Sequence, residues 1–179
     1  MAFLDRLGDP RHRQFYDYWN GKRAGRSMPR RRDIDPIDIP QLLLNIMIAE
    51  VVGSRFRFRL IGSAIVEAFG TNSTGKFLDE ICSGGYRDFI TGVYRTVCAE
   101  KRPVFAESEF ATSKGYSITA RRLFLPLSED DRSVDRIVAL HLFQYRSAAP
   151  AVIELDRSGD AARHKAEVMP ASPDEGERG

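Results

Sequence analysis

Residues 56–76, FRFRLIGSAIVEAFGTNSTGK, decide the fold because two different periodicities meet inside this stretch. Apolar residues alternate with arginines from 56 to 61, which is the two-residue period of a half-buried β-strand. After Gly62 the apolar residues follow a helical spacing, with Ser63 as the expected N-cap, and Gly70 is suited to the left-handed conformation that ends many helices. We therefore expect a strand, a tight turn and a short helix that together wall one side of a pocket beneath a sheet.

The flanking sequence predicts further strands and one long helix. Residues 45–52, NIMIAEVV, are nearly all apolar, and Gly53-Ser54 is typical of a hairpin turn into the strand that follows. Residues 86–101 carry apolar side chains at helical spacing until Pro103 stops the pattern. Strands are then predicted over three ranges, 104–112, 116–127 and 136–145. The order of these elements indicates an α+β fold with a five-stranded antiparallel sheet and helices on one face, as in the PAS fold.

The N-terminal region is predicted to form an amphipathic helix. Residues 11–22, RHRQFYDYWNGK, place Phe15, Tyr16 and Trp19 on one helical face, and a short helix of this kind needs a surface to lie on. We expect it to lie on the outer face of the sheet and to meet its twofold mate there, so that these three aromatic residues form a partner or dimer surface. The predicted organisation is an N-terminal helix and basic arm (1–32), a PAS-like domain (33–146) and a disordered tail (147–179), because no periodicity is sustained after Ser147.

Composition and charge place few restrictions on function. The net charge is +2, although residues 1–32 hold nine Lys and Arg against three Asp, a local charge of +6. The chain has two cysteines without metal-ligand spacing, no secretory signal pattern and no apolar run long enough for a membrane helix, which favours a reduced, cytoplasmic protein and makes a membrane partner unexpected. A charge so close to neutral makes nucleic acid an unlikely partner.

Three segments resemble a family of PAS-like proteins common in alphaproteobacteria. They are FYDYWNGKR, MPRRRDIDPIDIP and FRFRLIGSAIVEAFGTNSTGKFLDEI, and the resemblance covers about residues 15–145. It implies a stand-alone cytoplasmic sensory or regulatory module without catalytic residues. The resemblance supplies no ligand and no binding residues.

Periodicity alone suggests which side chains face the space between the sheet and the long helix. A ligand pocket is expected there, and cofactors are left unknown because the sequence requires none. A haem ligand at His141 is disfavoured because this residue lies within an apolar strand, where a neutral buried histidine is common, and the residues around Cys82 do not match a flavin-adduct motif. No metal site is predicted. The predicted lining residues are Phe58, Leu60, Phe69, Phe89, Val93 and His141.

Several arginines suggest sites for anions. Arg30, Arg31 and Arg32 are a candidate anion site for a nucleotide, although a solvated loop is the commoner role of such a run. Arg57 and Arg59 would either clamp an anion or pair with nearby carboxylates, and pairing is favoured. Residues 70–76 partly match a phosphate-binding loop, but a helix precedes them where a strand is required, Phe77 replaces the hydroxyl, and Asp79 and Glu80 add negative charge, so a structural role is favoured there.

The function that these observations favour is binding rather than catalysis. We expect a dimeric sensor that holds a small apolar or mixed ligand, or none, and passes its signal in trans to a separate protein such as a kinase or another regulator. One alternative is a nucleotide-binding regulator that uses the arginine-rich loop. A less favoured alternative is a small α+β enzyme with Glu107 or Glu109 as a pocket base.

Overall fold

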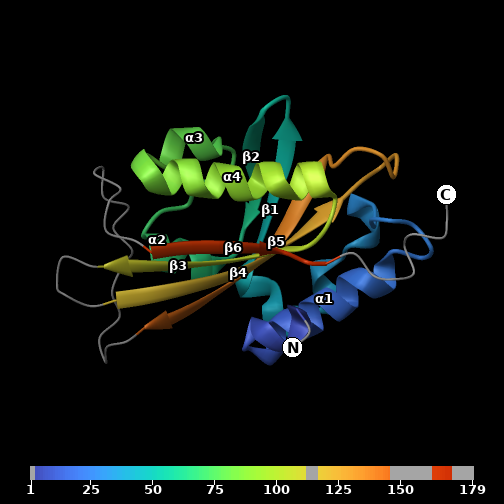
Figure 1. Ribbon diagram of the computed structural model, residues 1–179, viewed down its shortest axis with the longest axis horizontal. Helices are drawn as coiled ribbons and strands as arrows, with labels where there is room; N and C mark the ends of the chain where they lie inside the picture. Colours follow the sequence, from blue (N-terminus) through green and yellow to red (C-terminus); the bar gives the residue numbers. More distant parts are fainter. Residues whose placement is uncertain (1–2, 112–116, 146–162, 171–179) are drawn as a thin grey trace.

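The computed structural model shows one antiparallel sheet with helices on both of its faces (Figure 1). The structure describes residues 3–111, 117–145 and 163–170. The six strands run in the order β2-β1-β5-β4-β3-β6, and every neighbouring pair is antiparallel. The strands are β1 (Ile46–Val52), β2 (Arg55–Ile61), β3 (Val104–Ala111), β4 (Ser117–Leu127), β5 (Arg136–Tyr145) and β6 (Arg163–Val168).

Four α-helices accompany this sheet. They are α1 (Pro10–Lys22), α2 (Ser63–Phe69), α3 (Leu78–Ile81) and α4 (Gly84–Glu100). Four 3-10 helices occur before β1, at Phe3–Leu7, Arg31–Asp33, Pro36–Asp38 and Pro40–Asn45. The predicted α+β class, the PAS-like order of strands and the N-terminal helix are confirmed, and the ends of two predicted strands at residues 112 and 116 lie outside the described residues.

The stretch that decides the fold behaves largely as its two periodicities predict. Strand β2 pairs with β1 across a two-residue turn in which Gly53 has a φ of 60°. Helix α2 ends at Gly70, whose φ of 69° is the left-handed conformation expected for a terminating glycine. Its N-cap is Gly62, one residue before the predicted Ser63, and no side chain caps this end. The backbone alone therefore makes the turn from strand to helix.

Strand β6 lies in the region predicted to be a disordered tail, so the sheet has six strands where five were expected. It pairs with β3 from Val168 opposite Val104 to Arg163 opposite Glu109. Its sequence, RHKAEV, is polar and mostly exposed, and it is held at the sheet edge by backbone pairing, so no hydrophobic periodicity marks it. The rest of the predicted tail, 146–162 and 171–179, lies outside the described residues.

The two faces of the sheet are covered by different helices. On β4, Arg122 and Phe124 point toward α4, where they contact Tyr86 and Tyr94 respectively. On β3, Phe105 points to the other side and contacts His12 of α1, with ring centroids 5.4 Å apart. We call the α4 side the inner face and the α1 side the outer face. Figure 1 shows the same separation, with α4 and α1 on opposite sides of the strands.

Helix α1 is bound to its own chain through the aromatic side chains that were predicted to meet a partner. Phe15 is 1% exposed and Trp19 is 2% exposed, and Trp19 Nε1 donates to the carbonyl of Pro126 over 2.9 Å. Tyr16 is half-buried against the same core. The predicted partner surface is therefore corrected: an amphipathic pattern cannot distinguish a helix that covers its own sheet from one that covers another chain.

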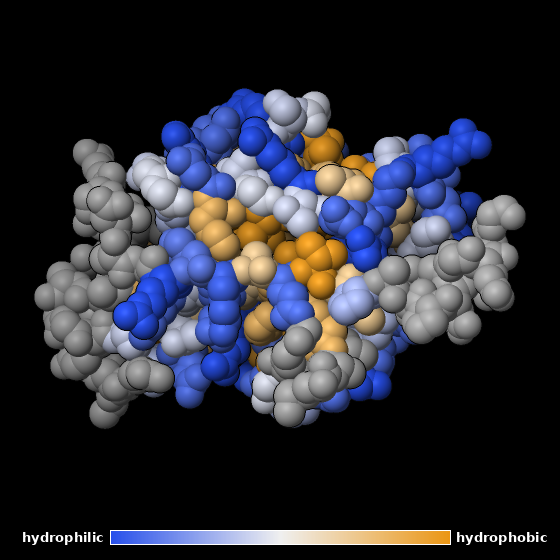
Figure 2. Space-filling view, viewed as in Figure 1, coloured by the Kyte–Doolittle hydropathy of each residue, from blue (hydrophilic) through white to orange (hydrophobic). Residues whose placement is uncertain are grey.

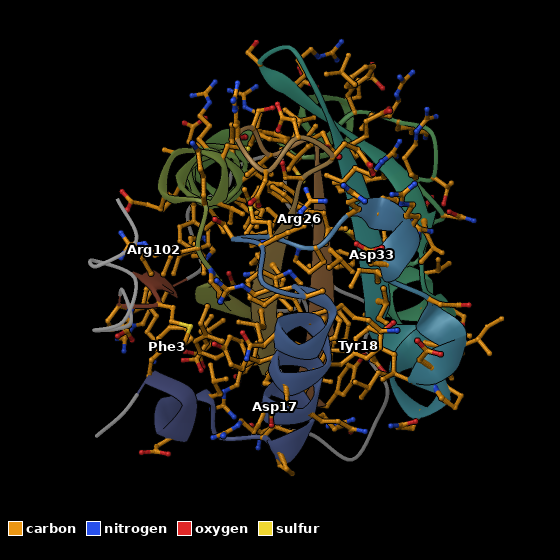
Figure 3. All side chains as sticks on the ribbon, turned by 90° about the vertical axis from the view of Figure 1, so that its right-hand side faces the viewer. Phe3, Asp17, Tyr18, Arg26, Asp33 and Arg102 are labelled. Atoms are coloured by element: carbon orange, nitrogen blue, oxygen red, sulfur yellow. The ribbon has the colours of Figure 1, made fainter. Side chains whose placement is uncertain are left out.

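The polar side of α1 is tied to the 3-10 helices that precede β1. The Tyr18 hydroxyl donates to the carbonyl of Asp35 over 2.9 Å and accepts from the amide of Asp35 over 2.8 Å. Lys22 Nζ lies 2.8 Å from Asp38 Oδ2. Figure 3 shows Tyr18 projecting from α1 toward these helices. Helix α1 is thus part of the folded domain rather than a separate arm.

His12 makes the stability of this packing depend on pH. Burial against the outer face lowers the pKa of His12 to about 4, whereas the unfolded chain returns it to about 6.5. Between these values the unfolded state binds a proton that the folded state does not, so stability falls as pH falls through this window, by about 3 kcal/mol at most. Urea unfolding at pH 7 and pH 5 should show this loss, and His12→Phe should reduce it. Equal stabilities of the wild type at both pH values would contradict the burial of a neutral imidazole.

Candidate functional site

A cavity of about 270 Å³ lies between helices α2, α3 and α4 and the inner face of the sheet. Most of its wall is apolar, with polar side chains from α3, α4, β4, β5 and the segment between α2 and α3. In Figure 2 apolar surface gathers in the middle of one face, between α4 and β6, and hydrophilic side chains surround it. The cavity is lined by Met47, Phe58, Ile61, Ile65, Phe69, Thr71, Ser73, Lys76, Leu78, Glu80, Ile81, Cys82, Tyr86, Ile90, Tyr94, Arg122 and His141.

The structure places three of the six predicted lining residues in the cavity wall, namely Phe58, Phe69 and His141. Leu60 does not line it, because the register between β1 and β2 shifts between Ile48 and Ala49. This shift puts Ile61 on the inner face instead of Leu60. Alternation along β2 alone could not predict the shift.

The other two predicted residues, both on α4, face different partners. Phe89 stacks on His164 of β6, with ring centroids 4.5 Å apart and an interplanar angle of 13°. Val93 is 3% exposed and packs in the core beside the cavity. The cavity instead receives the stripe Tyr86, Ile90 and Tyr94, at a spacing of four residues. Because β6 was not predicted, nothing in the local pattern assigned Phe89 to another neighbour.

Arg122 is the most unusual residue of the cavity wall. Its side chain is fully buried, with 0% exposure, although it carries a fixed positive charge. Nη1 donates to the Tyr86 hydroxyl over 2.7 Å and Nη2 donates to Ser108 Oγ, while Nε has no partner. Within residues 3–111, 117–145 and 163–170, no carboxylate forms an ion pair with it. A buried cation without a counter-charge is costly, so this arrangement marks the cavity as a site.

His141 lies directly opposite Arg122 on the neighbouring strand. It is 4% exposed, and neither ring nitrogen has a hydrogen-bond partner among the described residues. Burial, with the positive charge of Arg122 as a second cause, holds the pKa of His141 well below its usual range. The imidazole is therefore neutral, and one of its nitrogens can donate while the other accepts.

Tyr86 and Cys82 also belong to the buried wall. Burial raises the pKa of Tyr86, so its phenol stays protonated. Burial also raises the pKa of the Cys82 thiol to about 11, so it does not act as a thiolate. Glu80 is the acidic residue of the described lining, and its carboxylate lies 3.2 Å from Arg55 Nη2 and accepts from the amide of Phe77. The buried part of the described wall consequently presents donors and the positive charge of Arg122, whereas Lys76 and Glu80, which also line the cavity, are exposed.

The arginines of the predicted anion sites lie elsewhere. Arg31 and Arg32 border a surface hollow that also contains the carboxylates of Glu129, Asp130 and Asp135. The negative charge of these groups offsets the arginines and disfavours an anion there. Arg30 lies beside this hollow, and its amide donates to Asp33 Oδ2 over 2.9 Å.

Arg57 and Arg59 pair with a carboxylate, as favoured from the sequence. Both lie against Glu50, at 3.1 Å and 3.0 Å. Neither guanidinium is therefore free to bind an anion, which was the alternative considered for these two arginines.

The carboxylates proposed for an enzymatic role are not in the cavity. Glu107 lies on the outer face, where it pairs with Arg121 at 2.7 Å and with Lys165 at 2.9 Å. Glu109 lies two residues further along β3 and so faces the same side. Because the sheet separates both residues from the cavity, neither is placed to act as a base there.

Comparison with known proteins identifies a family. The model of a family described as a PAS domain matches residues 8–141, which include α1 and the strands from β1 into β5. No curated protein matches the chain. In the described part of the chain, no helix is long and apolar enough to cross a membrane, and no group of His, Cys, Asp or Glu is arranged to hold a metal ion.

Proposed function

The chain belongs to the PAS domain family, whose members are sensory and regulatory modules, and from this premise we propose that it senses a small molecule bound between α4 and the inner face of the sheet. The observation that carries the proposal is the cavity itself, which is mostly apolar and has a few polar groups directed into it. The module acts by binding and does not catalyse a reaction.

The volume of the cavity limits the size of the ligand. About 270 Å³ is room for roughly nine waters at about 30 Å³ each, so the ligand has about ten non-hydrogen atoms. Such a molecule would contact α4 and the sheet at once. Binding would then favour one position of α4 relative to the strands, which is how a ligand changes a surface that a partner recognises.

Narrowing the cavity should weaken binding. Ile90 projects from α4 into the cavity, and Ile90→Phe replaces its aliphatic side chain with a larger aromatic one. Native mass spectrometry of freshly purified wild-type protein should show a small-molecule mass that is lost on denaturation, and a smaller fraction of the variant should carry this mass. Leu44→Phe, at a side chain that is 57% exposed, is the matched control and should retain the ligand.

Two outcomes would contradict the ligand proposal. The first is equal occupancy in wild type and Ile90→Phe, which would place the ligand elsewhere. The second is a wild-type protein that carries no small molecule and whose unfolding temperature no small apolar compound raises.

We further propose that the signal leaves the module through protein contacts, in a homodimer and through a separate regulatory protein. PAS domains commonly act through such contacts, and this supports the proposal. Light scattering after size-exclusion chromatography should give twice the mass of the chain. A single-chain mass at micromolar concentration would contradict the dimer.

A further inference from the structure

We propose that the ligand is a small monocarboxylate whose carboxylate binds Arg122 and whose apolar body fills the cavity between α2, α3 and α4. This inference rests on the proposed function and adds the chemical class of the ligand. It depends on the charge of one side chain and on the unused hydrogen-bonding groups around it.

The first step is the missing counter-charge. Arg122 is fully buried, and its two bonded nitrogens meet only hydroxyl groups, those of Tyr86 and Ser108. Hydroxyl oxygens satisfy the N–H groups but leave the positive charge uncompensated. Glu80, the acidic residue of the described lining, is engaged with Arg55. An anion that enters the cavity would supply the charge that the chain does not.

The second step is the set of donors that surround this charge. Arg122 Nε has no partner, and one ring nitrogen of His141 carries a hydrogen that also has none. The Tyr86 hydroxyl accepts from Arg122 over 2.7 Å, which leaves its own hydrogen available to donate. All three residues line the cavity. Donors of this kind in a water-poor site are suited to the oxygens of an anion.

The third step distinguishes among anions. Arg122 is the buried charge of the described lining, the neutral His141 and Tyr86 add none, and Lys76 and Glu80 of the same lining are exposed and carry opposite charges, so the buried end of the cavity balances one negative charge. A phosphate group would bring up to two negative charges and more acceptor oxygens than the three donors can satisfy. The remaining wall includes Ile65, Phe69 and Ile90, which suit an aliphatic or aromatic body. These features favour a carboxylate over a phosphate.

The test uses probes that share one apolar body and differ in the head group. Phenylacetate, phenylacetamide and benzylphosphonate are titrated into the full chain by calorimetry, after any bound molecule is removed by unfolding and refolding. Octanoate and octanamide repeat the comparison with an aliphatic body. We expect each carboxylate to bind at least tenfold more tightly than its amide, and phenylacetate more tightly than benzylphosphonate.

Neighbouring arginines on β4 provide the matched variants. Arg122→Gln should remove the preference for the carboxylate, so that acid and amide bind within about twofold of each other. Arg121→Gln changes the same residue type on the outer face, where Arg121 pairs with Glu107, and should keep the tenfold preference. Arg122→Lys retains a charge without the planar fork and should give an intermediate ratio, which also decides the question if Arg122→Gln does not fold.

The outcomes separate this inference from the proposed function. Equal binding of acid and amide by the wild type overturns the carboxylate while the ligand cavity stands. Tighter binding of the phosphonate overturns it in favour of a phosphate-bearing ligand. Failure of every probe to bind the wild type overturns the carboxylate inference, and the ligand cavity is then judged separately by the native mass of the freshly purified protein.

Discussion

Gly62→Ala is expected to lower the free energy of unfolding by about 3 kcal/mol or more, which is a large effect for the addition of one methyl group. The backbone conformation is not the cause, because Gly62 has an ordinary φ of −65°. A Cβ atom at this position would lie 2.2 Å from the carbonyl oxygen of Leu44 and 2.5 Å from its carbonyl carbon. These are backbone atoms, so the chain before β1 would have to move away from the turn that joins β2 to α2.

Gly92→Ala is the matched control for this substitution. Gly92 lies inside α4, and an added Cβ would meet nothing within 4 Å. Alanine is favoured over glycine in a helix, so this variant should be more stable than the wild type by about 0.5–1 kcal/mol. Urea unfolding followed by circular dichroism measures both changes. A Gly62→Ala variant within 1 kcal/mol of the wild type would contradict the close approach of Leu44 to the turn.

Trp19→Ala is expected to destabilise the protein by about 3–5 kcal/mol, the usual cost of removing a large buried aromatic side chain. Trp19 is 2% exposed, and its loss also leaves the carbonyl of Pro126 without its donor. Trp19→Phe keeps most of the apolar area and should cost less. Because Trp19 is the one tryptophan of the sequence, unfolding has to be followed by circular dichroism.

The effect of Trp19 on stability distinguishes a covering helix from a partner surface. Gln14→Ala, on the exposed side of α1, is the control and should stay within about 0.5 kcal/mol of the wild type. A Trp19→Ala protein of unchanged stability that converts from dimer to monomer would contradict the packing of α1 on its own sheet. It would also restore the partner surface predicted from the sequence.

The fold could be predicted from the sequence where local periodicity and tertiary packing agree. The turn at Gly53, the end of α2 at Gly70 and the α4 helix all follow from residues near them in the chain. Strand β6 could not be predicted in this way, because its stability comes from pairing with β3, about sixty residues earlier in the chain. The side of β6 that faces α4 and the core carries His164, Ala166 and Val168, which are too small and polar a set to give a hydrophobic pattern in the sequence.

The cavity was predictable only in part, for a related reason. Strand alternation indicates that Arg121 and Arg122 point to opposite faces, but it does not tell which one is buried. Which arginine is buried depends on which face of the sheet α4 covers. Helix α4 carries Tyr86, whose hydroxyl accepts the hydrogen bond from Arg122. The shift in register that exchanges Leu60 for Ile61 is likewise a property of two paired strands and not of either strand alone.

The most direct test of the ligand cavity is a crystal structure of the protein purified rapidly and without refolding. The account predicts electron density for a non-protein molecule of about ten non-hydrogen atoms between α4 and the sheet, with an oxygen within hydrogen-bonding distance of Arg122 Nε. A cavity closed by the side chains of Tyr86, Ile90 and His141, with a protein carboxylate paired to Arg122, would contradict it.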